Sequence, residues 1–429
     1  MPGRNADCSG GVKGVEQPWE VLIAGGGLVG LALALALDAA GRGRWRIAVV
    51  EAAALPEGDG QPIYRAGFDA RSTALSRGSE LILRDLGLWQ TLAPHAAPIR
   101  HIHVSQRGAA GSTELHAEAH GWEALGHVVE NAWLGAVLLA AVRQRPAIAL
   151  YPGRRLQRAQ LQSDCALVEG EGGASFRARL LCIADGARSP LAASLGMGCS
   201  HHDYRCSALV TNVVTDRPHR QWAYERFADS GPMALLPLPT QQGRHRSALI
   251  WSLSPERAEV LAEAGEGEFL QAAQQLLGYR PGRLVHCGRR QLHPLGRSLA
   301  REQVRRRVAV MGNAAHALHP VAGQGFNLSL RDVAALAREL AGQEDVGELA
   351  PLLRYSEGRR ADQARTIGLS HHLPGLFELQ QPGAGALRGL GLMAMDLLPG
   401  LRRGFGAVAA GCGPGMVQGV RECENNSWM

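Results

Sequence analysis

Three short apolar stretches of the chain each end at a glycine or a polar side chain. They cover residues 21–24, 179–184 and 307–311. Their apolar positions are contiguous, which is typical of parallel strands that are covered on both faces. Residues 200–285 carry alternating, β-rich runs instead, and this pattern predicts an antiparallel sheet. We therefore expect an α/β fold in which an antiparallel sheet is inserted into a parallel one.

The first apolar stretch runs into a Gly-x-Gly-x-x-Gly turn formed by Gly25, Gly27 and Gly30, and residues 31–40 predict the helix after it. The glycines permit a tight bend, a close approach of the backbone to a pyrophosphate, and close packing of the helix on the strand. The amino end of the helix offers N–H groups to the phosphates. Glu51 ends the next predicted strand, where a carboxylate can accept hydrogen bonds from a ribose diol. This stretch predicts a site for an adenine dinucleotide.

The other two apolar stretches lead to polar groups that we expect at the same edge of the sheet. Asp185 follows the second stretch and Asn313 follows the third. Open α/β sheets bind ligands beyond the carboxyl ends of their strands, so both side chains are predicted to bond ribose or ribityl hydroxyls. Farther along, the turn Gly323-Gln324-Gly325 has small residues that allow a flat ring to approach closely.

A helix is predicted after that turn from the spacing of its apolar residues. One face carries Leu330, Val333, Leu336 and Leu340, which recur at helical intervals. The charged side chains are expected to point outward, and they are Arg331, Asp332, Arg338 and Glu339. The amino end of this helix would stabilise negative charge on a bound ring.

The basic residues are almost all arginine. Lys13 is the single lysine among 45 basic residues, so the folded body has neither a phosphate-binding Gly-Lys-Ser/Thr loop nor a Schiff-base lysine. The net charge of +6 does not indicate a nucleic-acid partner, because 39 acidic residues are interspersed and there is no basic stripe. The chemistry must therefore come from backbone amides, arginines, carboxylates, histidines or a bound cofactor.

Cysteine and histidine spacing adds little further chemistry. The eight cysteines form no C-x-x-C pair, which favours a reduced cytoplasmic protein over a disulfide framework. The pairs His201-His202 and His316-x-x-His319 lack further ligands at a suitable spacing, so no metal site is predicted. Residues 1–18 are polar, lack the apolar core of a secretory signal and predict a disordered tail.

The three strings together resemble the signatures of the single-component flavoprotein aromatic hydroxylases. They are the glycine turn at 25–30, the string Asp185-Gly186-Ala187-Arg188-Ser189-Pro190 and the stretch 312–332, in the family's order between residues 20 and about 340. Asn313 replaces the Asp of most members, and the string around it is similar to the ubiquinone-biosynthesis hydroxylases, most of all those acting on 2-polyprenyl-6-methoxyphenol. Four further strings agree with this subgroup, at 69–76, 128–131, 225–227 and 231–238.

This resemblance implies a Rossmann-like FAD-binding domain of residues 19–199 and 286–345, a substrate domain of 200–285 and a helical region of 346–429. It implies a monooxygenase that uses FAD, O₂ and NAD(P)H to hydroxylate a polyprenylated methoxyphenol in ubiquinone biosynthesis, through a C4a-hydroperoxyflavin. NAD(P)H would bind transiently, because there is no second convincing glycine turn. The lipid tail implies peripheral contact with the cytoplasmic membrane or with other ubiquinone-biosynthesis proteins, through the apolar residues of 390–401.

The resemblance also implies roles for individual residues. Those expected to bind FAD are Gly25, Gly27, Gly30, Glu51, Arg71, Asp185, Asn313, Gly323, Gln324, Gly325 and Asn327. Pro320, Gly323 and Gly325 are expected beside the flavin C4a carbon, and His316 is either a proton relay or a packed side chain. Those expected to bind the phenol are Tyr224, Met233 and Leu235.

Two other functions stay open at this point. An FAD-dependent reductase of a prenyl lipid has a similar architecture. A flavin-binding scaffold subunit of a biosynthetic complex is compatible with Asn313 and with the lack of an obvious acid–base pair. A flavin halogenase is excluded, because it needs a lysine deep in the fold and Lys13 precedes the first predicted strand.

Overall fold

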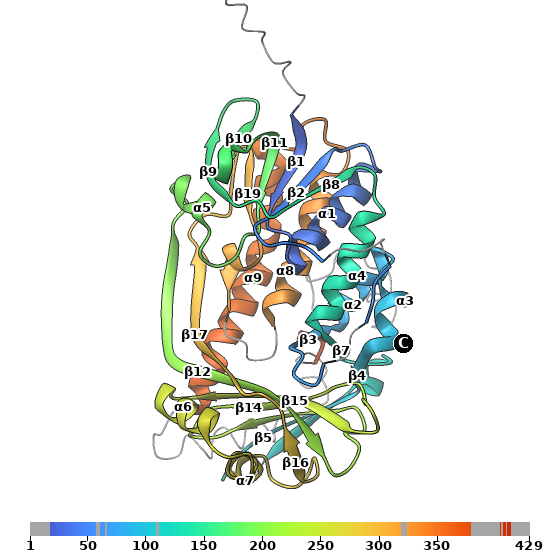
Figure 1. Ribbon diagram of the computed structural model, residues 1–429, viewed down its shortest axis with the longest axis vertical. Coiled ribbons are helices and arrows are strands. Elements are labelled where there is room, and N and C mark those ends of the chain that lie inside the picture. Colours follow the sequence, from blue (N-terminus) through green and yellow to red (C-terminus); the bar gives the residue numbers. More distant parts are fainter. Residues whose placement is uncertain are drawn as a thin grey trace, which may run out of the picture.

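Two large β-sheets organise the chain, one toward each end of the molecule in Figure 1. The computed structural model describes residues 18–56, 61–64, 67–108, 111–318, 324–378, 404, 406–408 and 410–412. A small third sheet lies between the large ones. The mixed α/β architecture confirms the fold class that the hydrophobic pattern predicts.

The first sheet is built on parallel strands in the order β18-β19-β11-β1-β2-β8, with β9 and β10 added beside β11. Neighbours from β19 to β8 run parallel, and the pairs β18–β19, β10–β11 and β9–β10 run antiparallel. The strands are β1 (Trp19–Ala24), β2 (Ile47–Glu51), β8 (Ile148–Pro152), β9 (Leu156–Leu161), β10 (Ala166–Gly170), β11 (Ser175–Ile183), β18 (Val304–Arg305) and β19 (Val308–Val310).

Both faces of this sheet are covered, which explains its contiguous apolar strands. Val21 and Ile23 pack into one core cluster, whereas Leu22 and Ala24 pack into another on the opposite face. The first cluster includes α1 (Leu28–Gly41), α4 (Asn131–Arg143) and α8 (Gln324–Leu340). Helix α1 is apolar all round because it lies between the sheet and its neighbours α4 and α8.

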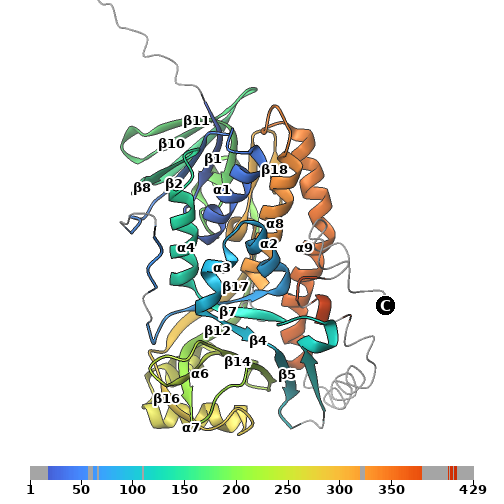
Figure 2. The same ribbon diagram turned by 90° about the vertical axis from the view of Figure 1, so that its right-hand side faces the viewer.

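Helix α9 (Leu349–Glu378) lies along α8 (Figure 2) and overturns one expectation from the sequence. The predicted apolar face of α8 is buried, but Arg331 and Asp332 are buried too, with exposed fractions of 3% and 1%. The Nε of Arg331 donates to Asp362 Oδ2 at 2.8 Å, and the Nε of Arg359 donates to Asp332 Oδ1 at 2.6 Å. Periodicity locates the apolar face of one helix, but it does not show that a second helix covers the polar face.

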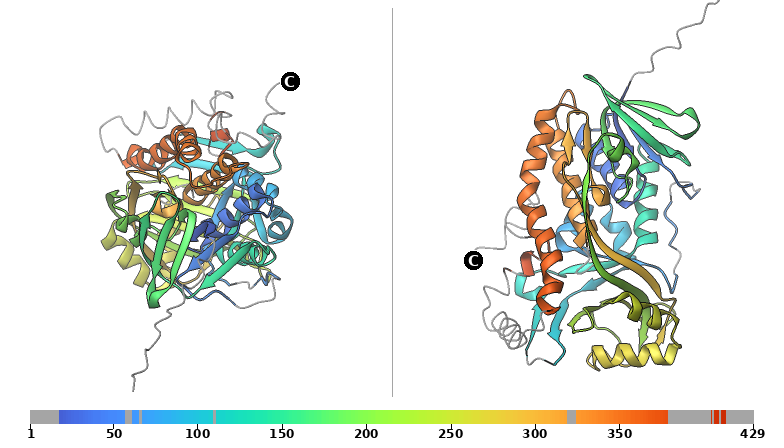
Figure 3. Two further views of the ribbon diagram at one scale, coloured as in Figure 1. Left: turned by 90° about the horizontal axis from the view of Figure 1, so that it is seen from above. Right: turned by 90° about the vertical axis from the view of Figure 1, so that its left-hand side faces the viewer.

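The second sheet has the order β20-β17-β12-β15-β14-β13-β5-β6, with β16 beside β12. All its pairs are antiparallel except β13–β5. The strands are β5 (His101–Gln106), β6 (Ser112–His116), β12 (Cys199–Thr215), β13 (Trp222–Phe227), β14 (Met233–Pro237), β15 (His245–Leu253), β16 (Leu284–Cys287), β17 (Gln291–Ala300) and β20 (His316–Ala317). The long pair β12–β17 reaches back toward the first sheet (Figure 3).

This sheet takes more of the chain than the predicted 200–285. Strands β5, β6 and β17 belong to it, although the sequence pattern assigned their residues to the FAD-binding domain. Alternation shows that a segment is a strand, but the sheet it joins is decided by pairing with distant residues. One face packs against α6 (Pro255–Glu263) and α7 (Glu266–Leu277). We call this the outer face, and the opposite one, toward the FAD-binding part, the inner face.

The third sheet, β3-β7-β4, lies against the inner face. Arg246 of β15 and Glu130 of β7 are fully buried there, and the guanidinium Nη2 donates to Glu130 Oε1 at 3.1 Å and to Gly67 O at 2.9 Å.

The remaining elements are β3 (Ser72–Ser76), α2 (Arg77–Asp85), α3 (Trp89–Leu92), η1 (Ala93–His95), β4 (Ala96–Ile99), η2 (Ala117–His120), β7 (Gly126–Glu130), η3 (Glu171–Gly173), α5 (Pro190–Ser194) and η4 (Gly312–Ala314).

Among the described residues, none of the helices is long and apolar enough to cross a membrane. The predicted membrane-contacting stretch 390–401 and residues 1–17 of the predicted tail lie outside the described residues.

The charge cluster between α8 and α9 gives a stability prediction. Replacing Asp362 by Ala removes the carboxylate of the buried Arg331 and should cost about 3–5 kcal/mol, because an uncompensated charge stays buried. Urea unfolding of the purified protein measures this change. Glu339→Ala is the control, since its partner Arg354 is exposed, and it should cost less than about 1 kcal/mol. Equal, small losses in both variants would contradict the prediction.

Candidate cofactor and substrate site

The three predicted strings meet at one edge of the first sheet. Ala24 pairs with Ile183, and Ile183 pairs with Val310, in parallel register. The segments that follow these residues therefore leave the sheet side by side. After β19, the chain passes through η4 directly into β20 of the second sheet. The site consequently lies between the two large sheets.

The glycine turn fits a bound pyrophosphate. A Cβ at Gly30 would lie 1.9 Å from Gly25 O, so only glycine allows α1 to pack this closely on the turn. Gly25 has φ +105 and faces Ala184 O, where a Cβ would lie at 2.4 Å. A Cβ at Gly27, by contrast, would meet no atom within 4 Å. Gly27 caps α1 without a side-chain hydrogen bond, so open space and N–H groups remain for an anion.

Glu51 lies against this turn at the end of β2. Its Oε2 accepts a hydrogen bond from Gly26 N at 2.6 Å, and its Oε1 accepts one from Ala53 N at 2.9 Å. The two backbone donors fix the carboxylate beside the glycines. This is the place expected for the group that binds a ribose diol.

Asp185 has an unused acceptor. Its Oδ2 accepts from Ser189 Oγ at 2.9 Å, whereas Oδ1 is buried without a hydrogen-bond partner. Burial raises the pKa of this carboxyl, and the hydrogen bond from Ser189 opposes the rise. A buried acceptor without a donor is costly, and a hydroxyl of a bound ribityl or ribose group would satisfy it.

The remaining predicted FAD-binding residues take different positions. Asn313 is exposed at η4, and Gln324 and Gly325 form the first residues of α8. Arg71 is exposed before β3. The pKa of His293 on β17 is lowered mainly by burial of the imidazole and further by the positive charge of Arg71. Pro320 and Gly323 lie outside the described residues.

Asn327 has a structural function visible in its hydrogen bonds. Its Oδ1 accepts from Ser76 N at 2.9 Å and from Ser79 Oγ at 2.7 Å, while its Nδ2 donates to Ala74 O at 2.8 Å. The side chain thus ties the amino end of α8 to β3 and α2. These hydrogen bonds fix the helix end beside which the sequence predicts FAD.

His316 is completely buried beside the turn that joins the two sheets. Its Nε2 lies 2.6 Å from Asp332 Oδ2, and its Nδ1 is buried without a partner. Burial alone would raise the pKa of Asp332, but the contacts with His316 and Arg359 lower it overall. Asp332 is therefore an anion that holds His316 in place. The complete burial of His316 agrees with the alternative that it is a packed side chain.

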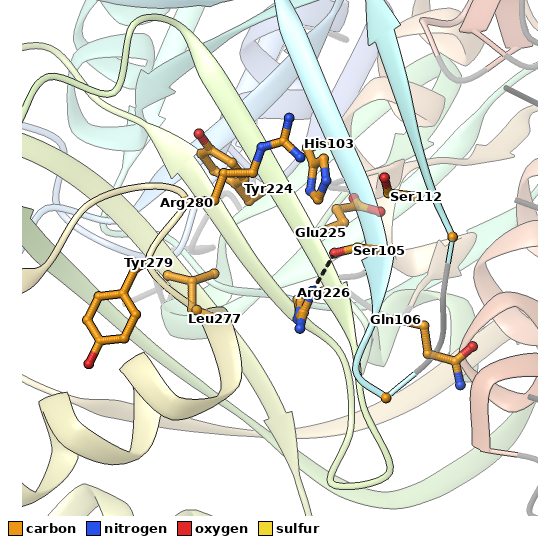
Figure 4. A pocket seen from close by; sticks show the side chains of 13 residues that line it. His103, Ser105, Gln106, Ser112, Tyr224, Glu225, Arg226, Leu277, Tyr279 and Arg280 are labelled. Atoms are coloured by element: carbon orange, nitrogen blue, oxygen red, sulfur yellow. Dashed lines mark hydrogen bonds between the residues drawn. The ribbon is translucent and has the colours of Figure 1, made fainter. Parts of the chain in front are cut away.

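The three predicted phenol-binding residues lie on the outer face. Tyr224, Met233 and Leu235 pack with the side chains of α6 and α7. Tyr224 also lines an outer cavity of about 350 Å³, together with His103 and Arg280 (Figure 4). The period of two places alternate residues of β14 on opposite faces, but the sequence alone does not show which face meets the cofactor.

The inner face presents another set of residues, of which only Leu236 lies in the apolar run 233–238 that the sequence predicts to line the phenol site. Leu236 and Ile250 are partly exposed and lie beside a small apolar cluster with the third sheet. Glu225 of β13 pairs with Ala234, so its strand position is on the inner face as well, and it also lines the cavity next to Tyr224. Its carboxylate forms no ion pair within the described part of the chain, and burial raises its pKa. The sequence could have pointed to Glu225, because it is the only carboxylate in β13, which apart from Arg226 is otherwise aromatic and apolar.

The glycine turn yields a prediction that separates folding from cofactor binding. Gly30→Ala should lower the melting temperature and abolish flavin binding, because its Cβ would collide with Gly25 O. Gly27→Ala should leave the melting temperature of the flavin-free protein unchanged, yet weaken FAD binding about 10–100-fold, because the new methyl takes space needed by the pyrophosphate. Thermal unfolding and FAD titration measure the two effects. Wild-type FAD affinity in Gly27→Ala would place the pyrophosphate elsewhere.

Comparison with known proteins agrees with this geometry. The FAD binding domain family model matches residues 18–368. The chain is 32% identical to the ubiquinone hydroxylase UbiL of Rhodospirillum rubrum, over 93% of this chain and 91% of that protein. It is also 32% identical to the 3-demethoxyubiquinol 3-hydroxylase of Escherichia coli, over 90% of this chain and 97% of that protein.

Solved structures share the fold at lower sequence identity. The p-nitrophenol 4-monooxygenase PnpA of Pseudomonas putida superposes with a TM-score of 0.72 at 18% identity, covering 92% of this chain and 97% of that one. PqsL of Pseudomonas aeruginosa, a probable FAD-dependent monooxygenase, gives 0.70 at 20% identity, with coverage of 88% and 100%. We call the glycine turn 25–30, Glu51 and Asp185, which would hold FAD at the strand ends, the FAD cradle. Together with the match to the family model and these relatives, this arrangement shows that the chain belongs to the FAD binding domain family, as an FAD-dependent aromatic hydroxylase related to the ubiquinone hydroxylases.

Proposed function

We propose that this protein hydroxylates the aromatic ring of a polyprenylated methoxyphenol in ubiquinone biosynthesis, with O₂ and NAD(P)H as co-substrates. The observation that carries the proposal is that the glycine turn, Glu51 and Asp185, which would hold FAD, lie at the strand ends from which the chain passes into the second sheet with its partly apolar inner face. The names of the relatives support the substrate class, since two of them act on ubiquinone or its precursors.

The residues of the FAD cradle would bind and orient the cofactor. The amides at the start of α1 would hold the pyrophosphate, Glu51 would accept from the ribose, and the free Oδ1 of Asp185 would accept from a hydroxyl of the linker. When bound, the flavin supplies the oxygen-transfer chemistry. Asn327 fixes the amino end of α8, and the positive end of this helix dipole would stabilise negative charge on a bound flavin.

The inner face of the second sheet would hold the phenol. Leu236 and Ile250 offer apolar surface on which an aromatic ring can pack and from which water is displaced. Glu225 supplies the polar group among them. A carboxylate in this position can accept the proton of the phenol hydroxyl, which makes the ring richer in electrons and more reactive toward an electrophilic oxygen. Burial raises the pKa of Glu225, which brings it closer to the range useful for a base.

Isotope labelling tests the reaction. The FAD-loaded protein is mixed with NADH or NADPH, a short-chain prenyl methoxyphenol and labelled O₂, and the products are analysed by mass spectrometry. The proposal expects a hydroxylated ring that carries one labelled oxygen atom. Reduction of the prenyl double bonds without ring oxidation would establish a prenyl reductase instead. Stable FAD binding with no turnover of either kind would favour the scaffold alternative.

A substitution at Glu225 tests its role as the base. Glu225→Gln should lower kcat/KM for the phenol about 100-fold, the scale expected on losing a general base, while the FAD content stays unchanged. A base acts only when deprotonated, so wild-type activity should rise as the pH passes the raised pKa of Glu225, and this rise should vanish in the variant. The control is Glu268→Gln on the exposed side of α7. Equal pH profiles for wild type and Glu225→Gln would contradict the role.

A further inference from the structure

Two histidines and a glutamate gather at the outer edge of the second sheet. His101 of β5 and His116 of β6 are cross-strand partners, and their Nδ1 atoms lie 2.9 Å apart. Glu118 follows in η2. One ligand atom from each of the three side chains falls within 4.8 Å of the other two. The imidazoles are partly buried and the carboxylate is exposed, so an ion could enter from solvent.

Neighbouring side chains fix the orientation of both rings. Trp222 stacks on His101 with ring centroids 4.7 Å apart, and it meets the His116 ring edge-on at 5.8 Å. The Nε2 of His116 lies 3.4 Å from Glu114 Oε2. A carboxylate at that nitrogen favours the tautomer with its proton on Nε2 and a lone pair on Nδ1. Metal-binding histidines are commonly held in this way by a second carboxylate.

From this arrangement we propose that His101, His116 and Glu118 form a binding site for a divalent transition-metal ion such as Zn²⁺, with His116 oriented by Glu114. The ligand set of two imidazoles and one carboxylate is one that Zn²⁺ accepts, and it leaves one position for water. Oxygen-preferring ions such as Mg²⁺ are not expected to bind, because imidazole nitrogen is a poor ligand for them.

The distances require only small movements. Tetrahedral Zn²⁺ with ligands at about 2.0–2.1 Å separates its donor atoms by roughly 3.3 Å. The two Nδ1 atoms at 2.9 Å would move apart by a few tenths of an ångström. The Glu118 side chain would swing inward, which costs little because it is exposed. Without an ion, one Nδ1–H donates to the other Nδ1 at the same position.

The site would add a link between η2 and the paired strands β5 and β6. The ion would hold β5, β6 and η2 together on the side of the sheet where Trp222 and Tyr224 stack, with ring centroids 6.1 Å apart. This edge belongs to the outer face, whereas the proposed phenol site belongs to the inner face. The inference therefore stands independently of the proposed reaction.

Calorimetric titration of the tag-free, FAD-loaded protein with Zn²⁺ tests the proposal, after chelator treatment and removal of the chelator. We expect one tight Zn²⁺ site per chain and no binding of Mg²⁺. His101→Gln and His116→Gln should weaken Zn²⁺ binding by about 100-fold or more, and Glu114→Gln by about 10–100-fold, as for other orienting carboxylates. The flavin absorbance of each variant shows that it has folded. In Cu²⁺-loaded protein, electron paramagnetic resonance should show two coupled nitrogen nuclei, and one in His116→Gln.

Two matched controls exclude other binding places. His286 has a carboxylate neighbour, because its Nδ1 lies 2.7 Å from Glu266 Oε1. This pair does not include a second imidazole. Cys199 Sγ lies 2.9 Å from His201 Nε2 and is the competing pair. His286→Gln and Cys199→Ser should bind Zn²⁺ as the wild type does. The proposal is overturned if the wild type binds no Zn²⁺, if His101→Gln and His116→Gln bind it normally, or if Cys199→Ser loses it.

Discussion

The close contact of three backbone segments at the end of β1 is the constraint on which the structure depends. A side chain at Gly25 would collide with Ala184 O, and a side chain at Gly30 would collide with Gly25 O. Only glycines at these places let α1 pack on the strand while β11 stays paired beside it. The same contact brings Asp185 next to the glycine turn, although the two are far apart in the sequence. The cofactor cradle is therefore a consequence of strand packing.

A second constraint is the group of buried charges that fixes α8 between the sheet and α9. Asp332 accepts from Arg359 Nε at 2.6 Å and from Gln363 Nε2 at 3.1 Å, and its Oδ2 lies 2.6 Å from the Nε2 of His316. Buried charges of this kind are tolerable only when they are paired, and removing one member leaves the others uncompensated. Because His316 lies two residues after the end of η4, the network connects α9 to the turn that joins the two sheets. The position of the amino end of α8 is set by this packing and by Asn327.

The second sheet separates two kinds of chemistry by the alternation of its side chains. On β13, Tyr224 packs on the outer face, where the polar cavity and the histidine pair also lie. Its neighbour Glu225 occupies an inner-face position of the strand and also borders this cavity. A strand has a side-chain period of two, so adjacent residues of one strand serve different surfaces. A change of one residue in register would exchange these functions.

The sequence by itself determined the parallel core, the glycine turn, Glu51 and Asp185, because these depend on local patterns: contiguous apolar strands, glycine spacing and polar groups at strand ends. It also indicated the family through three motifs in a fixed order. The tertiary structure decided what depends on distant partners. It buried Arg331 and Asp332 under α9, recruited β5, β6 and β17 to the second sheet, and packed Met233 and Leu235 against α6 and α7. It also placed His101 opposite His116 through cross-strand register. No local pattern carries this information, because a side chain's surroundings are set by the segments that pair with it and pack against it.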